Sequence, residues 1–94
     1  MENYAKYGWV ITFLVGEHVN IVGPANIDPA LHSSLIANGG EEFRVIAEEG
    51  GNLTHGRIIG DYDGFEPMSD YLIPSYGLTQ IEYVNPKTHV WELL

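Results

Sequence analysis

The sequence predicts an α+β domain in which an antiparallel sheet of about five or six strands is accompanied by one short helix. Three observations lead to this prediction. Residues 41–48 and 79–84 alternate between apolar and polar side chains, residues 8–15 form a continuous β-branched and aromatic run, and one later segment combines helical spacing with a cap and a stop. Because the chain has 94 residues, we expect a single domain spanning residues 1–94.

Two strands are expected near the N-terminus. Residues 8–15 are apolar on both alternating faces, which is typical of a central strand that is covered on both sides. Residues 16–17 can turn the chain, and residues 18–22 then form a second strand that ends at the Gly-Pro pair of residues 23–24.

The predicted helix begins at Pro29, with Asp28 as its N-cap, and ends at the Asn-Gly-Gly stop of residues 38–40. Within it, the apolar side chains of Leu31, Leu35 and Ile36 are spaced to share one face. A helix of about three turns is marginal in isolation. We therefore expect this face to pack on the sheet.

Two hairpins complete the predicted sheet. Residues 41–48 pair with a strand at residues 53–60, and the alternation places the side chains of even and odd positions on opposite faces. Residues 79–84 pair with residues 89–93 across a type I turn at residues 85–88.

The stretch between the hairpins, residues 61–78, is irregular. A short helical turn is expected near residues 67–71, and a loop of this length is either functional or pinned by its apolar side chains. The side chains expected to pin it are Phe65, Tyr71, Leu72 and Ile73. The predicted core comprises Trp9, Ile11, Phe13, Val15, Leu31, Leu35, Phe43, Val45, Ile58, Ile81, Tyr83 and Trp91.

Composition restricts the classes of function. The 13 acids and 4 bases give a net charge of −9, which opposes direct binding to nucleic acid or to an anionic membrane and favours a basic partner or a cation. The alternative is that the charge only keeps the protein soluble. The absence of cysteine excludes disulfides, thiolate zinc sites and a cysteine nucleophile, and it favours a cytoplasmic protein. The apolar run at residues 9–15 is too short to span a bilayer, and no signal peptide is expected.

The sequence contains no complete catalytic or metal-binding pattern. Residues 61–64 begin like a calcium loop, but the EF-hand spacing would place a third ligand on Phe65 and the bidentate acid on Leu72. The 4 histidines lack ligand spacing, and no serine elbow or phosphate-binding glycine loop occurs. We therefore expect a non-enzymatic protein with no catalytic residue, metal or cofactor. A divalent-metal or small-ligand module using the 61–70 loop stays open as an alternative.

Acidic and aromatic residues gather in the first hairpin and in the long loop. Aromatic rings rimmed by acids suit the recognition of a basic protein surface, since the rings anchor the contact while the charge steers it. The alternative is that the rings hold the loop down and the acids are merely solvated. The predicted partner-binding residues are Glu41, Glu42, Glu48, Glu49, Asp61, Tyr62, Asp63, Phe65, Glu66, Asp70 and Tyr71.

Short segments throughout the chain resemble a loose group of uncharacterised small acidic proteins of bacteriophages and mobile elements. The segments that carry this resemblance are residues 8–12, 23–24, 43–44, 56–58, 60–67, 79–83 and 91–92. Small acidic phage proteins include anti-CRISPR proteins, and the likeness to these is one of class and charge. The resemblance implies an inhibitor in the host cytoplasm that binds a basic surface of a nucleic-acid-binding defence complex. A small structural or accessory protein that self-associates through sheet edges, for example as a homodimer, is the alternative.

Overall fold

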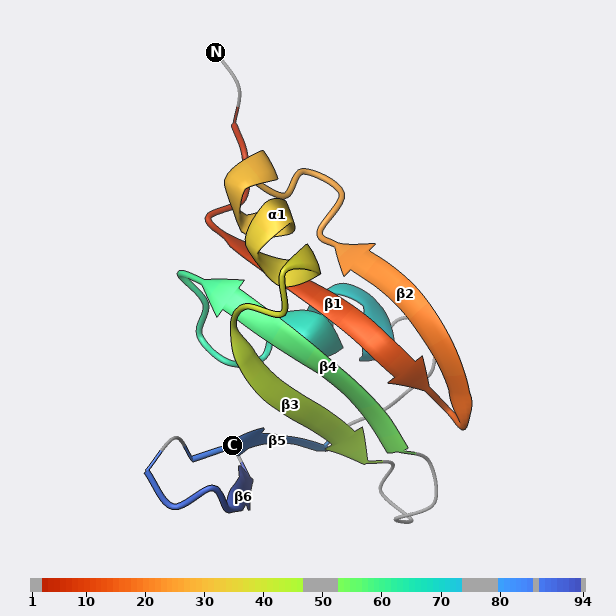
Figure 1. The fold of residues 1–94 in the computed structure, drawn as a ribbon. Coiled ribbons are helices and arrows are strands. Elements are labelled where there is room, and N and C mark those ends of the chain that lie inside the picture. The colour runs from red at the N-terminus through yellow and green to blue at the C-terminus, as the bar shows by residue number, and fades with distance from the viewer. Residues whose placement is uncertain (1–2, 47–52, 74–79, 86, 94) are drawn as a thin grey trace.

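Six antiparallel strands form one sheet in the computed structural model, which describes residues 3–46, 53–73, 80–85 and 87–93 (Figure 1). The strands lie in the order β2-β1-β4-β3-β5-β6. Their bounds are β1 Tyr7–Leu14, β2 Glu17–Gly23, β3 Glu41–Ile46, β4 Leu53–Gly60, β5 Gln80–Val84 and β6 Trp91–Leu93. Two helical elements accompany them, α1 at Pro29–Ile36 and the π-helical turn η1 at Met68–Leu72. The predicted antiparallel sheet with a short helix is confirmed, and the arrangement fits a small α+β fold.

The first two strands are joined by a two-residue turn. Leu14 pairs with Glu17, and between them Val15 has a φ of 48° and Gly16 a φ of 89°. Positive φ at both central positions is the geometry of a type I′ turn, whose twist matches that of the strands it joins. The turn therefore lies one residue earlier than the predicted turn at residues 16–17.

A β-bulge interrupts β1 at Thr12. The register with β4 moves from Ile11 opposite Gly56 to Phe13 opposite His55, so Thr12 is an extra residue on β1. An extra residue reverses the faces to which the following side chains point, because side chains on a strand alternate with a period of two.

The bulge decides which side chains of β1 reach the core. Trp9 and Ile11 share the buried face with Leu14 rather than with Phe13, which is half-buried on the opposite face. The prediction that Val15 belongs to the core is wrong, because this side chain lies in the turn and is 42% exposed. The main buried cluster comprises Trp9, Ile11, Leu14, Phe43, Val45, Ile58, Met68, Leu72 and Ile81.

The two helical elements cover opposite faces of the sheet (Figure 1). Leu35 of α1 lies beside Gly8 of β1. On the other face Met68 and Leu72 of η1 pack against the buried face of β1. Strand β1 is therefore an interior strand that is covered on both sides, as predicted.

Helix α1 begins and ends as predicted. The Asp28 carboxylate accepts a hydrogen bond of 2.8 Å from the backbone N–H of Ala30, and Pro29 occupies the first helical position. At the other end, Asn38 has a φ of 65° and the backbone N–H of Gly39 donates to a helix carbonyl, which ends the helix.

One face of α1 packs on the sheet through its leucines. Leu35 is fully buried and Leu31 is half-buried over the end of β4. The expectation that Ile36 shares this face is wrong, because Ile36 is 55% exposed. It follows Leu35 directly and is therefore rotated from it by about 100° around the helix axis. Arg57 of β4 donates a hydrogen bond of 2.9 Å to the Leu35 carbonyl, so a cation lies at the C-terminal end of the helix.

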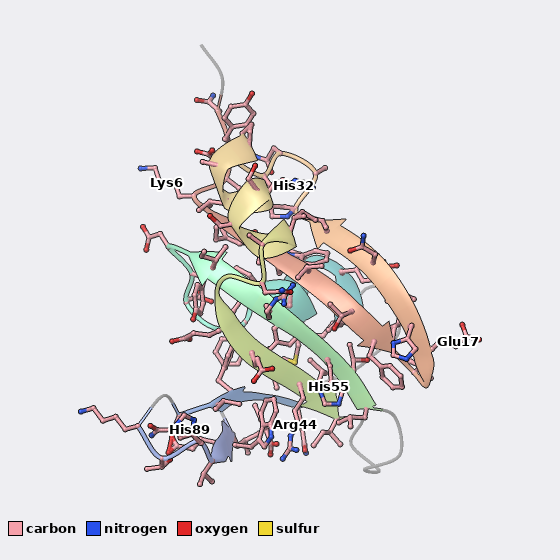
Figure 2. All side chains as sticks on the ribbon, in the orientation of Figure 1. Lys6, Glu17, His32, Arg44, His55 and His89 are labelled. Carbon is pink, nitrogen blue, oxygen red and sulfur yellow. The ribbon has the colours of Figure 1, made fainter. Side chains whose placement is uncertain are left out.

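The part of the same face that α1 leaves uncovered carries aromatic and basic side chains. The Arg44 guanidinium lies 4.4 Å from the centre of the Trp91 ring, and its Nε is 2.5 Å from Oε1 of Glu82. His55 meets Trp91 edge-on, with ring centroids 6.3 Å apart. Figure 2 shows Arg44 and His55 near each other at this end of the sheet. The two arginines of the chain, Arg44 and Arg57, therefore both lie on the α1 face.

The C-terminal hairpin confirms that the two predicted strands pair, but β6 begins at Trp91 rather than at His89, so the connection is longer than the predicted turn at residues 85–88. Ile81 is buried and Tyr83 is half-buried on the core face, whereas Glu82 points to the other face and pairs with Arg44. In the connection between the strands, the Asn85 side chain accepts a hydrogen bond of 2.8 Å from the backbone N–H of Lys87.

Candidate functional site

The segment from Asp61 to Ile73 crosses the η1 face, and aromatic side chains hold its first part against the sheet. The Tyr62 ring is stacked on the Tyr83 ring of β5, with centroids 6.1 Å apart and planes inclined by 26°. The Tyr62 hydroxyl donates a hydrogen bond to Glu41 at the start of β3, and the Tyr83 hydroxyl donates one of 2.6 Å to the carbonyl of Gly64. These contacts bring the acidic loop to the beginning of β3.

Asp63 and Glu66 form a reciprocal pair at the entry to η1. The two carboxylate oxygens of Glu66 accept from the backbone N–H of Asp63 at 2.8 and 2.9 Å. In return, Oδ1 of Asp63 accepts from the backbone N–H of Phe65 at 3.1 Å. This resembles a capping box, in which two side chains satisfy backbone donors ahead of a helical turn. Asp63 is exposed and Glu66 is only 9% exposed.

Asp70 connects η1 to the middle of the sheet. Its Oδ2 accepts a hydrogen bond of 2.6 Å from the Tyr7 hydroxyl and one of 3.1 Å from Nε1 of Trp9. The neighbouring Tyr71 ring lies 5.8 Å from the Trp9 ring, centroid to centroid. The acidic end of η1 is therefore fixed by donors from β1.

The four carboxylates that this segment and β3 bring together are called the acidic face, and they belong to Glu41, Asp63, Glu66 and Asp70. Burial raises the pKa of Glu66, and the hydrogen-bonded Asp63 and the charge of Asp70 raise it further. The pKa of Asp63 is lowered, chiefly by hydrogen bonding to Glu66 and to the backbone of Phe65. The carboxylates therefore act on one another electrostatically.

Three tyrosines lie within the electrostatic field of these carboxylates. Burial first, and then the neighbouring carboxylates, raise the pKa of Tyr7, Tyr62 and Tyr83 above the ordinary value. Glu66 is among the carboxylates that raise the pKa of all three tyrosines. The acidic face is thus one electrostatic unit that includes its aromatic rim.

Hydrogen bonds orient the carboxylates of the acidic face but do not neutralise their negative charge. Its carboxylates accept from hydroxyl, indole and backbone N–H groups, which are all neutral donors. Within residues 3–46, 53–73, 80–85 and 87–93 the only ion pair is that of Arg44 with Glu82, on the α1 face. Figure 2 shows Lys6 extending away from the sheet. Negative charge therefore accumulates on the η1 side of the sheet, and the arginines lie on the other side.

The structure places the predicted partner-binding residues on different parts of the surface. Glu41 lies on the acidic face, whereas Glu42 points to the α1 face, because successive strand residues alternate and Phe43 is in the core. Asp61 is exposed just after β4. Glu48 and Glu49 lie outside the described residues.

Some of the aromatic and apolar side chains of the long loop are buried and others are exposed. Phe65 is 45% exposed and Ile73 is 46% exposed, so the expectation that these two pin the loop is wrong. The other two predicted side chains do pin it, because Leu72 is buried and Tyr71 packs against Trp9, and Met68 is buried beside them. An exposed Phe65 beside the acidic face is available to a partner.

Tyr7 and Trp9 were not among the predicted site residues, although both bind Asp70. The sequence signals only that a buried Trp needs an acceptor for its N–H, and it does not identify Asp70 as that acceptor. Trp9 also lines a pocket of about 380 Å³ between β2 and η1, together with Asp70 and Tyr71. This pocket opens beside the acidic face.

Neither a metal-ion site nor a membrane-spanning helix is found among the described residues. In the part of the chain that the structure describes, no group of three or more His, Asp and Glu side chains is placed to hold a metal ion. None of the helices described has both the length and the apolar character needed to cross a membrane.

Comparisons of the chain with protein-family models, with curated proteins and with solved structures found no match. The resemblance to small acidic phage proteins therefore stays an expectation. The geometry and the charge of the acidic face carry the functional conclusion.

Proposed function

We propose that this protein is a non-enzymatic binding protein whose acidic face docks on a basic surface of another protein. The observation that supports this most directly is the convergence of four carboxylates with no basic partner among the described residues. Uncompensated charge steers a basic partner during encounter, and Tyr62 and Phe65 supply aromatic contact area.

The internal hydrogen bonds of the acidic face favour this role. Glu41 is held by Tyr62, and Asp70 is held by Tyr7 and Trp9. A carboxylate that is already oriented loses little conformational freedom when a partner binds, so less of the interaction energy is spent on ordering side chains. The donors are neutral, so they leave the negative charge of the exposed carboxylates of Glu41, Asp63 and Asp70 uncompensated.

The partner class follows from the sign and size of the charge. Proteins that bind nucleic acid present lysine and arginine to phosphates, and a chain with a net charge of −9 competes for such surfaces. The likeness in class to anti-CRISPR proteins agrees with this partner. The proposed function is therefore inhibition of a nucleic-acid-binding defence complex in the host cytoplasm, by occupation of its basic surface.

Displacement of nucleic acid tests this function. Fluorescence anisotropy of a labelled DNA target on an RNA-guided nuclease complex should fall when the protein is added. The double variant Glu41→Gln with Asp63→Asn should displace less DNA, whereas Glu42→Gln, on the opposite face of the same strand, should act like the unaltered protein. Equal potency of the two variants, or no displacement across a panel of such complexes, would contradict the proposal.

A second candidate function is self-association through an edge of the sheet. Strand β2 is seven residues long and stands at one end of the strand order, so one of its sides has no neighbouring strand among the described residues. Such an edge offers backbone N–H and C=O groups to a second strand. Light scattering over a range of concentrations tests this, and a constant monomer mass would exclude it.

A further inference from the structure

The pocket beside the acidic face is built from both the sheet and η1. Its volume is about 380 Å³. The lining residues that matter here are Trp9, Ile21, Pro24, Asp70 and Tyr71. Gly23 lies opposite Trp9 in the sheet, and a Cβ at this position would be 2.3 Å from Cζ2 of the Trp9 ring. The glycine therefore allows the indole to lie across β2, where it forms a wall of the pocket.

The lining combines aromatic rings, a carboxylate and an aliphatic surface. The rings of Trp9 and Tyr71 have centroids 5.8 Å apart and planes inclined by 42°. Asp70 adjoins them and is held by the indole N–H. Aromatic faces attract cations, a carboxylate strengthens this attraction, and Ile21 and Pro24 offer contact for methylene groups.

We propose that this pocket receives a lysine side chain of the basic partner, an inference that rests on the proposed function of the acidic face. The ammonium group lies against Asp70 and the aromatic rings, and the methylene chain lies along Ile21 and Pro24. Both hydrogen bonds that the Asp70 carboxylate accepts from the described residues fall on Oδ2. A guanidinium that binds through both carboxylate oxygens would compete with them, whereas an ammonium needs only one oxygen.

The chain provides its own reporter for this site. It contains 2 tryptophans, and their indole N–H groups give two separate NMR signals. The Trp9 indole donates to Asp70 in the pocket, whereas Trp91 lies beneath Arg44 on the α1 face. Binding in the pocket therefore shifts one signal, and the other serves as an internal reference.

Nα-acetyl-lysine N-methylamide is the probe, and its norleucine counterpart, which lacks the ammonium group, is the matched control. The lysine amide should shift the Trp9 signal saturably with a dissociation constant on the order of millimolar. Norleucine and arginine amides should bind at least several-fold more weakly, and the Trp91 signal should stay in place. Equal shifts from lysine and norleucine, or tighter binding of arginine, would overturn the proposal.

Two variants locate the site. Asp70→Asn removes the charge, and Ala25→Phe places a ring at the pocket rim without altering the groups that bind Asp70. Each should abolish the saturable shift, and Glu42→Gln should retain it. The dispersion of the amide signals reports whether each variant is folded. Retention of the lysine response in a folded Ala25→Phe variant would place the lysine elsewhere.

The result separates this inference from the function on which it rests. If a lysine-rich peptide binds the acidic face while the lysine amide leaves Trp9 unmoved, the pocket proposal fails and the proposed function stands. If the lysine amide binds but no basic peptide or protein does, the pocket is a small-cation site and the proposed function fails.

Discussion

The indole N–H of Trp9 donates a hydrogen bond of 3.1 Å to Oδ2 of Asp70, and so joins residues that are 61 positions apart in the chain. Trp9 belongs to the interior strand β1, and Asp70 belongs to η1. The bond therefore fixes the acidic segment to the most buried part of the sheet. The same carboxylate borders the proposed lysine pocket, so fold stability and ligand binding share one residue.

Substitution of Asp70 by Asn tests the structural part of this relationship. Asn keeps an acceptor oxygen but loses the charge that strengthens the bonds from Tyr7 and Trp9. We expect the free energy of unfolding to fall by about 1 kcal/mol. Urea denaturation followed by tryptophan fluorescence measures it, with the exposed Asp61→Asn as the matched control. Equal stability of the two variants would show that the charge of Asp70 contributes nothing to the fold.

Gly56 is expected to be the least replaceable glycine in the sheet. A Cβ there would lie 2.1 Å from the backbone oxygen of Val10 and 2.6 Å from the Phe43 ring. Because a backbone atom of an interior strand cannot easily move aside, Gly56→Ala should lower the free energy of unfolding by about 2–3 kcal/mol. Gly16→Asn is the control, since nothing lies within 4 Å of a Cβ at this turn and Asn tolerates its positive φ. A Gly56→Ala variant as stable as this control would contradict the described pairing of β1 and β4.

The N-cap of α1 gives a prediction that is independent of the acidic face. Asp28→Ala removes the acceptor for the Ala30 N–H, whereas Asp28→Ser retains one. The alanine variant should lose about 1 kcal/mol of stability, and the serine variant only a fraction of this. Thermal unfolding by circular dichroism measures both. Identical midpoints for the two variants would argue against a capping role for Asp28.

Stability should depend on pH through Glu66. The pKa of this carboxyl is raised above its ordinary 4.5 in the folded protein, so the folded state binds the proton more tightly than the unfolded state does. The stability that this group contributes is therefore complete below pH 4.5 and is lost as the pH rises through the raised pKa. The pKa of Asp63 is lowered from 3.8, so the stability that Asp63 contributes is present above this pH and is lost as the pH falls through the lowered pKa.

The variant Glu66→Gln isolates this effect. Gln has no proton to lose, although it keeps one acceptor for the backbone N–H of Asp63. Its free energy of unfolding relative to that of the unaltered protein should rise as the pH increases above 4.5, whatever constant difference separates the two proteins. Denaturation curves at several pH values test this. Parallel pH profiles of the two proteins would show that Glu66 titrates normally.

Local signals in the sequence predicted most of the secondary structure. Period-two alternation located β3 and β5, and Asp28, Pro29 and Asn38 located the ends of α1. The core prediction failed at Phe13, because the bulge at Thr12 that turns this side chain to the opposite face depends on pairing with β4. Such a register shift arises from contacts distant in sequence, and the β1 segment alone does not specify it.

The candidate site was predicted only in part, for two different reasons. The contact of Asp70 with Tyr7 and Trp9 depends on the three-dimensional path of the long loop, which no local pattern determines. In contrast, the reciprocal bonds of Asp63 and Glu66 follow the three-residue spacing of a capping box, a signal present in the sequence. The separation of Glu41 from Glu42 likewise follows from strand alternation.

Binding of a basic partner by the acidic face is tested most directly at the neighbouring residues Glu41 and Glu42. Each of the variants Glu41→Gln and Glu42→Gln removes one negative charge, but the two charges lie on opposite faces of β3. We propose to measure the affinity of a short lysine-rich peptide for both variants by calorimetry at low and physiological salt.

Glu41→Gln should weaken binding by about 1.4-fold to fivefold, because an exposed ion pair contributes about 0.2–1 kcal/mol. Glu42→Gln should leave the affinity within error of the unaltered protein, and added salt should reduce the difference between the variants. Equal losses in both variants would show that only net charge attracts the peptide, and the acidic face would then not be the binding site.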